Sequence, residues 1–383
     1  MSPAFRIGAV GFGLIAVCYG FARFAFGLFL PQIDSDLTLG PSISGIISGG
    51  SFAGYCIAII ISATLTERIG ARSVATAAAI VAAIGMAGIA FAPSSAILAV
   101  AVLVAGSSTG LASPPMAAAV AAAVREKRQD ITNTVINAGT SAGVAVSGPI
   151  ALAMAGQWRL AFGIFTAVAV VLAFATIFSL PNAASKKGMG GLPPMTGPVL
   201  RLIAASFLMG VASTALWSFG GQIVAGRFGW GPTGTGVLWS CIGAGGIAGA
   251  WAGSLVARFG IDRIHWAFLA MMSAGILAVG SGPTIPAVAL VGGAFFGAAY
   301  VMLTGVYLIW GVRALPDRPA TGLMIGFLTI AVGQSVGAPI FGLVMQGPGL
   351  GPAVIGFAGC ALLAGVFQAR RATSTPSAQH IRR

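Results

Sequence analysis

Two stretches of sequence, ATLTERIGAR at 63–72 and GSLVARFGID at 253–262, lie 190 residues apart and share a pattern. Arg68 and Gly70 in the first stretch have the counterparts Arg258 and Gly260 in the second. The same shift aligns other regions of the chain: Gln32-Ile33 with Gln222-Ile223, Arg128 with Arg318, Gly143 with Gly333, and Pro149-Ile150 with Pro339-Ile340. Because one shift serves several separated regions, the sequence predicts a duplicated unit whose two copies follow each other along the chain.

Both copies are strongly apolar. Hydrophobic residues make up 57% of the 383 residues and charged residues only 7%, with a mean hydropathy of +0.97. An ordinary soluble domain has about 25% charged residues. The composition therefore excludes a soluble enzyme, and it also excludes a disordered chain. The four cysteines lie inside apolar runs, so they indicate neither a disulfide framework nor a metal site.

The apolar runs have the length of membrane-spanning helices, which need about 20 residues each. Divided at prolines and charged clusters, they predict twelve helices, at 7–31, 43–65, 73–92, 96–124, 131–155, 159–180, 199–226, 235–257, 264–281, 285–312, 321–346 and 351–369. The predicted fold is all-α, with a six-helix half at 1–180, a linker at 181–198, a second six-helix half at 199–370 and a tail at 371–383.

Basic residues are distributed unevenly between the two ends of these predicted helices. The chain has 20 Lys and Arg residues against 7 Asp and Glu residues, and 17 of the 20 fall on one side of the predicted membrane. Loops rich in Lys and Arg stay in the cytoplasm, so we expect both termini to be cytoplasmic. The net charge of +13 then reflects orientation in a lipid bilayer, and no nucleic-acid partner is expected.

These features resemble the major facilitator superfamily, whose transporters have two six-helix halves around a central cavity. The family has a Gly-x-x-x-Asp-Arg-x-Gly-Arg-Arg pattern between helices 2 and 3, which is matched here by Glu67, Arg68, Gly70 and Arg72. The second copy keeps Arg258 and Gly260. The sequence WRLAF at 158–162 is similar to the family's WRWxF signature, and YGFARFAFGLFLP at 19–31 resembles the YbfB/YjiJ-type branch.

The resemblance implies a monomeric carrier in a bacterial inner membrane that moves a small molecule by alternating access, without a cofactor or metal. It also implies a cytoplasmic gate formed by Glu67, Arg68, Gly70, Arg72, Arg258 and Gly260. We expect Glu67 to meet the positive N-terminus of the helix that begins near Arg318. A charge cluster that only fixes the topology remains an alternative.

Arg23 is the one basic residue inside a predicted span. A charge at that depth is costly unless it is paired or hydrated. Tyr19, Arg23 and Gly27 recur every four residues, so they share one face of the helix. One interpretation is that Arg23 binds an anionic substrate with Tyr19 as a hydrogen-bond partner. The other is that Arg23 snorkels outward or bonds to backbone carbonyls.

Further candidate residues follow from the resemblance, because helices 1, 4, 7 and 10 line the cavity in that family. The predicted substrate contacts on helices 7 and 10 are Trp217, Gln222, Tyr300, Thr304 and Tyr307. Aromatic packing or an interfacial belt explains the aromatic members equally well. A polar stripe, Asn133, Asn137 and Ser141, is interpreted as hydrogen bonding between helices.

Acidic residues all fall outside the predicted spans, whereas proton-driven carriers usually have a carboxylate or His within the membrane. The sequence therefore favours a facilitator or exchanger for a small organic or inorganic anion. Efflux of hydrophobic drugs or metabolites is an alternative, and a membrane sensor or scaffold without transport is another. A membrane-embedded enzyme is not expected, because the paired acids or intramembrane His that its chemistry requires are missing from the spans.

Overall fold

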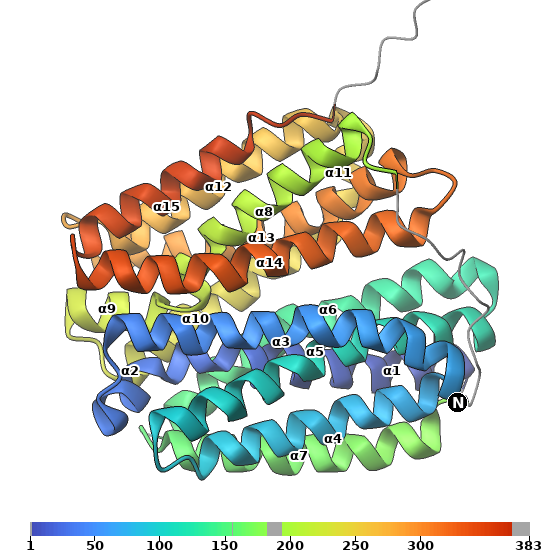
Figure 1. The fold of residues 1–383 in the computed structure, drawn as a ribbon, viewed down its shortest axis with the longest axis horizontal. Helices are drawn as coiled ribbons and strands as arrows, with labels where there is room; N and C mark the ends of the chain where they lie inside the picture. The colour runs from blue at the N-terminus through green and yellow to red at the C-terminus, as the bar shows by residue number, and fades with distance from the viewer. Residues whose placement is uncertain (1, 155, 182–193, 370–383) are drawn as a thin grey trace, which may run out of the picture.

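The computed structural model describes residues 2–154, 156–181 and 194–369, and in this part of the chain it contains helices and no strands. The helices run roughly along one axis in two groups, the N-terminal half below and the C-terminal half above (Figure 1). The prediction of an all-helical fold is confirmed for these residues. The predicted tail and most of the predicted linker lie outside the described residues.

The N-terminal half consists of long helices. The first span runs without a break from Pro3 to Leu37. The elements of this half are α1 (Pro3–Ile15), the π-helical η1 (Ala16–Phe24), α2 (Ala25–Leu37), α3 (Gly40–Ile69), α4 (Ala71–Ala90), α5 (Ser95–Ala123), α6 (Glu126–Ala153) and α7 (Trp158–Ser179). Ser2 and Ser94 cap α1 and α5, because their side chains accept the backbone N–H of Phe5 and Ile97.

The C-terminal half has shorter pieces. Its elements are α8 (Gly197–Trp217), α9 (Gly220–Phe228), α10 (Pro232–Gly246), the 3₁₀ turn η2 (Ile247–Trp251), α11 (Ala252–Phe259), α12 (Ile261–Gly280), α13 (Pro286–Ala314), α14 (Pro319–Gln346) and α15 (Leu350–Ala364). Proline lies in the first turn of α8, α10, α13 and α14, where the backbone N–H that it lacks has no helical partner.

The described residues contain ten helices that are long and apolar enough to cross a membrane, or eleven if the bent pair Pro232–Gly249 and Ala252–Phe259 is one span. The apolar α15, with 15 residues, is shorter. α1 begins and α15 ends at the same end of the bundle (Figure 1).

Two predicted helices are interrupted, and one is longer than expected. The helix predicted at 199–226 breaks after Trp217, and the helix predicted at 235–257 bends by 52° near η2. Both breaks lie in glycine-rich sequence, which has low helix propensity. The first helix, by contrast, continues through Pro31 to Leu37. Pro31 removes the N–H that would bond to the Gly27 carbonyl, but it does not end the helix here.

The two copies of the repeated motif have the same backbone conformation. Gly70 (φ 86°, ψ 157°) joins α3 to α4, and Gly260 (φ 84°, ψ 161°) joins α11 to α12. A positive φ of this size is open to glycine and strained for other residues, so glycine is required at both corners.

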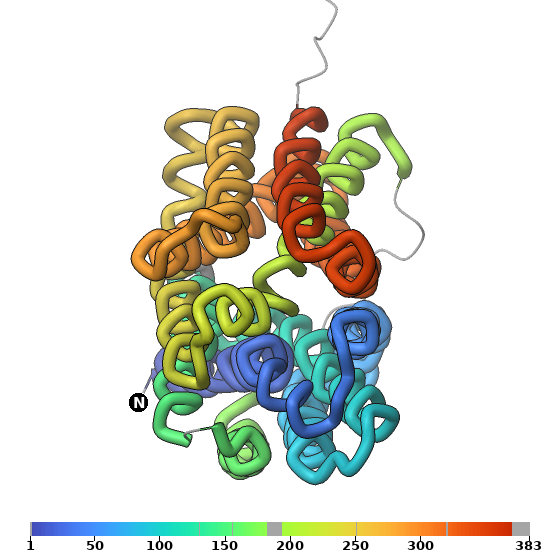
Figure 2. Tube along the Cα trace, turned by 90° about the vertical axis from the view of Figure 1, so that its left-hand side faces the viewer, coloured from blue at the N-terminus to red at the C-terminus, as the bar shows by residue number. Residues whose placement is uncertain are grey.

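The halves contact each other mainly through two helix pairs, α3 with α14 and α6 with α10. Gly45 on α3 lies against the Ala338 carbonyl, and Gly148 on α6 lies against the Gly236 carbonyl. Figure 2 also shows α9 beside α2, so the end of the bundle that carries α2 and α9 is closed by contacts between the halves.

Pro149 and Pro339 free backbone carbonyls in these pairs, because each lacks the N–H that a carbonyl four residues earlier would accept. The Ala145 carbonyl accepts a bond from the Ser240 hydroxyl across the halves, at 3.4 Å. The Ser335 carbonyl instead lies against Gly49. The carbonyls of Ala145 and Ser335, which the 190-residue shift aligns, thus both contact the opposite half.

Candidate functional site

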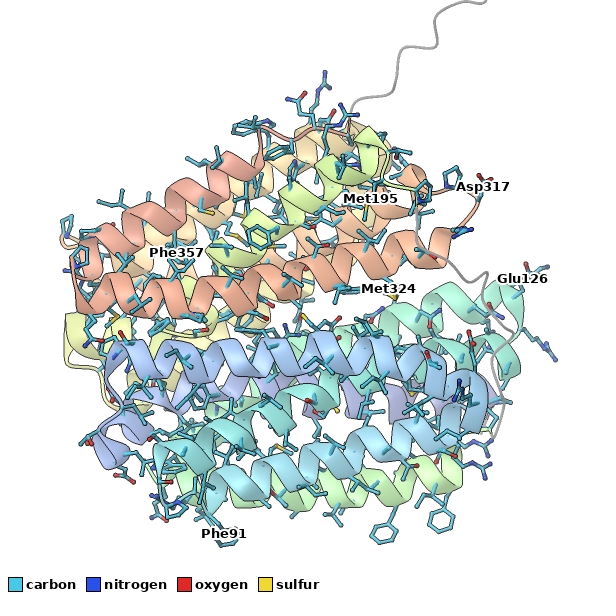
Figure 3. The ribbon with its side chains drawn as sticks, viewed as in Figure 1. Phe91, Glu126, Met195, Asp317, Met324 and Phe357 are labelled. Atoms are coloured by element: carbon cyan, nitrogen blue, oxygen red, sulfur yellow. The ribbon has the colours of Figure 1, made fainter. Side chains whose placement is uncertain are left out.

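A cavity of about 360 Å³ lies between the two halves. Its lining comes from α1, η1, α3, α5 and α6 of one half and from α10, η2, α13 and α14 of the other. Because most lining residues on α6 and both on α14 precede the middle of these helices, the cavity lies from the middle of the bundle toward the end where Glu126 and Asp317 are found (Figure 3). Its volume is in the range of small-molecule sites, about 300–1,000 Å³.

Arg23 lines this cavity and is 6% exposed. Its Nη2 donates a hydrogen bond of 2.6 Å to Oε1 of Gln334, and its Nε has no hydrogen-bond partner. Four aromatic rings surround the guanidinium, with distances from Cζ to the ring centre of 4.6 Å for Tyr55, 4.7 Å for Phe52, 5.1 Å for Phe24 and 5.7 Å for Tyr19. No acidic side chain of the described residues lines the cavity.

Gln334 on α14 connects Arg23 to the C-terminal half. Its Nε2 donates to the Ser213 hydroxyl at 3.0 Å and to the Tyr300 hydroxyl at 3.2 Å. Ser213 is the residue that the 190-residue shift places opposite Arg23, so Gln334 joins the two related positions. Sequence reasoning missed Gln334, although an amide in the middle of a predicted span was an available signal.

Tyr19 and Arg23 both lie in η1, the π-helical part of the first span. The N–H of Ala25 bonds to the carbonyl of Gly20, five residues earlier, as a π-helix requires. Gly20 packs directly on the backbone of Gly143, and this close approach brings η1 against α6. Single π-helical turns occur often at functional sites.

Of the predicted contact residues, Tyr19, Arg23, Tyr300 and Thr304 line the cavity. The Tyr19 hydroxyl shares a 3.0 Å hydrogen bond with Ser113. The Thr304 hydroxyl donates to the Tyr300 carbonyl at 2.8 Å, which satisfies it within its own helix.

The other predicted contacts lie outside the cavity lining. Trp217 stacks on Phe24 with ring centres 4.1 Å apart and is 5.2 Å from the Tyr300 ring, so it packs behind two lining residues. Tyr307 is fully buried in the C-terminal half, where its hydroxyl pairs with His265 Nε2 at 2.9 Å and donates to the Ala205 carbonyl at 3.2 Å.

The polar stripe on α6 has a different position from the expected one. Asn137 and Ser141 line the cavity, whereas the sequence favoured hydrogen bonding between helices. The structure gives the exposed amide of Asn137 no hydrogen-bond partner among the described residues. Its donor and acceptor atoms are therefore available inside the cavity.

Gln222 lies at the closed end, where it joins the halves. Its Nε2 donates to Asp34 Oδ2 at 3.0 Å, and Asp34 Oδ1 accepts the N–H of Gly40 at 2.7 Å. Asp34 was expected in a loop, but it lies in the last turns of α2. Next to it, Asp36 accepts bonds from Trp158 Nε1 at 2.8 Å and Arg159 Nη1 at 2.7 Å.

The predicted gate residues lie at helix ends. Glu67 and Arg68 are in the last turn of α3, and Arg258 is in the last turn of α11. Arg72, in the first turn of α4, donates from Nε to the Leu180 carbonyl at 2.7 Å. Within the described ranges no group of three or more His, Cys, Asp or Glu residues is placed to hold a metal ion.

A helical membrane bundle with repeated halves and a polar-lined cavity between them is the architecture of a secondary transporter. Comparison of the sequence with protein families agrees with this class. The profile of the Major Facilitator Superfamily matches residues 12–338, so the chain belongs to this superfamily. Family membership makes it a multi-pass membrane transporter rather than an enzyme. No curated protein matches the chain at a significant level.

Solved structures of three transporters have a similar fold. A mutant of the nucleoside transporter NupG superimposes with a TM-score of 0.79 at 12% identity, covering 95% of this chain and 98% of that one. The xylose transporter XylE from E. coli, in a partially occluded inward-open conformation, gives 0.77 at 14%, with coverages of 95% and 96%. A bacterial homologue of the human lysosomal transporter Spinster gives 0.73 at 14%, with coverages of 95% and 94%.

Proposed function

We propose that this transporter carries a small anion by alternating access and that Arg23 binds the negative charge. The observation that carries the proposal is the state of Arg23 in the cavity. The guanidinium is almost fully buried, its Nε is without a partner, and the described lining contains no carboxylate.

The surroundings stabilise the cation without neutralising it. A desolvated cation–π contact contributes about 2 kcal/mol, but an aromatic ring carries no net charge. Gln334 supplies only a neutral oxygen. An anion that enters the cavity would supply the missing charge and a charge-assisted hydrogen bond. Tyr19, Tyr300 and Thr304 are the proposed neighbours of the bound solute, with Trp217 packed behind Tyr300.

The proposed topology has twelve crossings and cytoplasmic termini, with α15 as the last crossing. The distribution of Lys and Arg and the shared position of the two chain ends support it. The end with Glu126 and Asp317 is then cytoplasmic, so the cavity belongs to an inward-facing conformation. Asp34 and Gln222 hold the periplasmic end closed in a bacterial inner membrane.

Three further assignments accompany this proposal. Residues 19–31 support membership of the YbfB/YjiJ-type branch. The residues from Glu67 to Arg72, with Arg258 and Gly260, are the cytoplasmic gate. The lack of Asp, Glu and His among the described lining residues favours a facilitator or exchanger over a proton-coupled carrier. That the carrier is a monomer is proposed from the family resemblance alone.

A second candidate function is efflux of hydrophobic compounds. The observation in its favour is the apolar share of the lining, which includes Phe24, Ile247, Val301, Leu308 and Phe327. The two functions differ in their dependence on Arg23, since a neutral or cationic lipophilic solute gains nothing from a guanidinium.

Thermal stabilisation of the purified protein by small anions and by lipophilic cations tests the proposal. A ligand that binds only the folded state raises its melting temperature. We expect an anion to stabilise the wild type and the exposed-residue control Arg263→Gln, and to lose at least tenfold in affinity in Arg23→Gln. The anion must then exchange across proteoliposomes. Stabilisation by lipophilic compounds alone, equal in all three proteins, would contradict the proposal and favour efflux. Binding without exchange would favour a sensor.

A further inference from the structure

The contacts of Arg23 narrow the class of anion, and this inference rests on the proposed function. We propose that the substrate is a monovalent carboxylate with an apolar body, and that its carboxylate replaces the Gln334 amide oxygen at Arg23.

The charge of the cavity favours a single negative charge on the substrate. Arg23 is the only cationic side chain among the described residues that line the cavity. One guanidinium neutralises one negative charge. A dianion would leave its second charge among largely apolar walls without a partner, which is costly at membrane depth.

The geometry of the guanidinium favours a carboxylate. Nε–H and one N–H of Nη2 point the same way along one edge of the group, and a carboxylate can accept from both with its two oxygens. Gln334 brings a single oxygen to the guanidinium, which accepts from Nη2, while Nε has no partner. Because Tyr55 and Phe52 lie within 4.7 Å of Cζ, a bound anion approaches the edge rather than the face.

Gln334 is bonded mainly within its own half. Its amide nitrogen donates to Ser213 and Tyr300, and among the described residues the bond to Arg23 is its one hydrogen bond to the other half. When a carboxylate binds to Nε and Nη2 of Arg23, the hydrogen bond between Arg23 on η1 and Gln334 on α14 is lost. Occupancy of the site is thereby coupled to a contact between the two halves.

The walls favour an organic body on the carboxylate. Apolar side chains from both halves face the cavity, among them Ile15, Val301 and Leu308, and a small inorganic anion would leave them in water. The exposed amide of Asn137 on the α6 side offers one hydrogen bond to a polar group on that body.

Ligand binding to the purified protein separates this inference from the broader proposal. The probes are phenylacetate and hexanoate as monocarboxylates, phenylacetamide as a neutral isostere, phenylmalonate as a dianion, and nitrate. We expect at least one monocarboxylate to bind tenfold or more tightly than the other three probes, and to lose this advantage in Arg23→Gln. Arg23-dependent binding of nitrate or phenylmalonate instead would overturn the carboxylate inference and leave the anion proposal standing. If no anion binds, both fail.

Two variants of Gln334 test the displacement without any ligand. Gln334→Glu places a built-in carboxylate at the edge of Arg23, whereas the near-isosteric Gln334→Met leaves the edge empty. We expect Gln334→Glu to raise the melting temperature relative to Gln334→Met by at least about 2 °C, and to abolish binding of the monocarboxylate that Gln334→Met still binds. A Gln334→Glu protein that is less stable than Gln334→Met, or that binds the monocarboxylate as the wild type does, would overturn the inference.

Discussion

The first span and the α8–α9 pair hold equivalent places in the two halves, yet they differ in shape and chemistry. The first span is continuous through Pro31 and contains the π-helical η1 with Arg23. Its counterpart breaks after Trp217 and has Ser213 in the position of Arg23.

What the halves still share is the way their helices approach each other. Gly143 on α6 lies against the Ala16 carbonyl, and Gly333 on α14 lies against the Phe207 carbonyl, one residue from the exact counterpart of Ala16. The duplication therefore preserves backbone contacts, whereas the charge is confined to one half. An asymmetric solute with a single charged end fits such a site better than a symmetric one.

We expect the largest effect from variants that disturb the glycine-to-carbonyl contacts shared by the two halves. Gly143→Ala and Gly333→Ala each place a methyl group against a backbone carbonyl that cannot move aside like a side chain. We expect each to lower the free energy of unfolding by about 1–3 kcal/mol, measured as a loss of folded protein and of melting temperature. Gly163→Ala, whose new methyl group meets nothing within 4 Å, is the matched control. A large effect at one glycine only would break the equivalence of the halves.

The next effect concerns the gate, where the halves differ. Glu67 has Ala257 as its counterpart, so only the first copy of the motif has an acid at this position. We expect Glu67→Ala to reduce transport at least tenfold, because the proposed contact with the positive N-terminus of α14 is lost. Affinity for the substrate should stay at the wild-type value. The exposed Glu126→Ala at the same end serves as a control, and unchanged transport in Glu67→Ala would remove the gate assignment.

We expect the smallest effect from a variant of Ser213, the residue that the 190-residue shift aligns with Arg23. Ser213→Ala removes one of the two acceptors for the Gln334 amide nitrogen, while the Tyr300 hydroxyl remains. Since a neutral hydrogen bond contributes about 1 kcal/mol net, the affinity for an anion should change by no more than about tenfold. A loss in Ser213→Ala as large as that in Arg23→Gln would show that both related positions bind the substrate.

Sequence reasoning predicted the features that depend on local pattern. Apolar runs predicted the helices. Because Arg23 is the one basic residue in a predicted span, it was predicted as a binding residue, and it lines the cavity. The bond between Arg23 and Gln334 joins residues 311 apart, so no local pattern predicts it. No local pattern predicted the π-helical turn, whereas the glycine-rich sequence at the two breaks in the C-terminal half was an available signal. Asn137 and Ser141 have the same spacing whether they face a helix or a cavity, and only the tertiary arrangement decides between the two.

Near Pro149 and Pro339, glycines of one half pack against backbone carbonyls of the other, and these contacts affect the free energy of switching between conformations. Glycine-to-carbonyl contacts are not directional, so the halves exchange few bonds when they separate there. The bonds described across the halves are Arg23–Gln334, Asp34–Gln222 and Ser240–Ala145. The first two include a charged group and contribute about 1.5–3 kcal/mol net each, whereas the neutral third contributes about 1 kcal/mol. Their sum corresponds to a preference of about 10³-fold to 10⁵-fold for the conformation in which they form. A solute offsets this preference by binding the other conformation more tightly by the same factor.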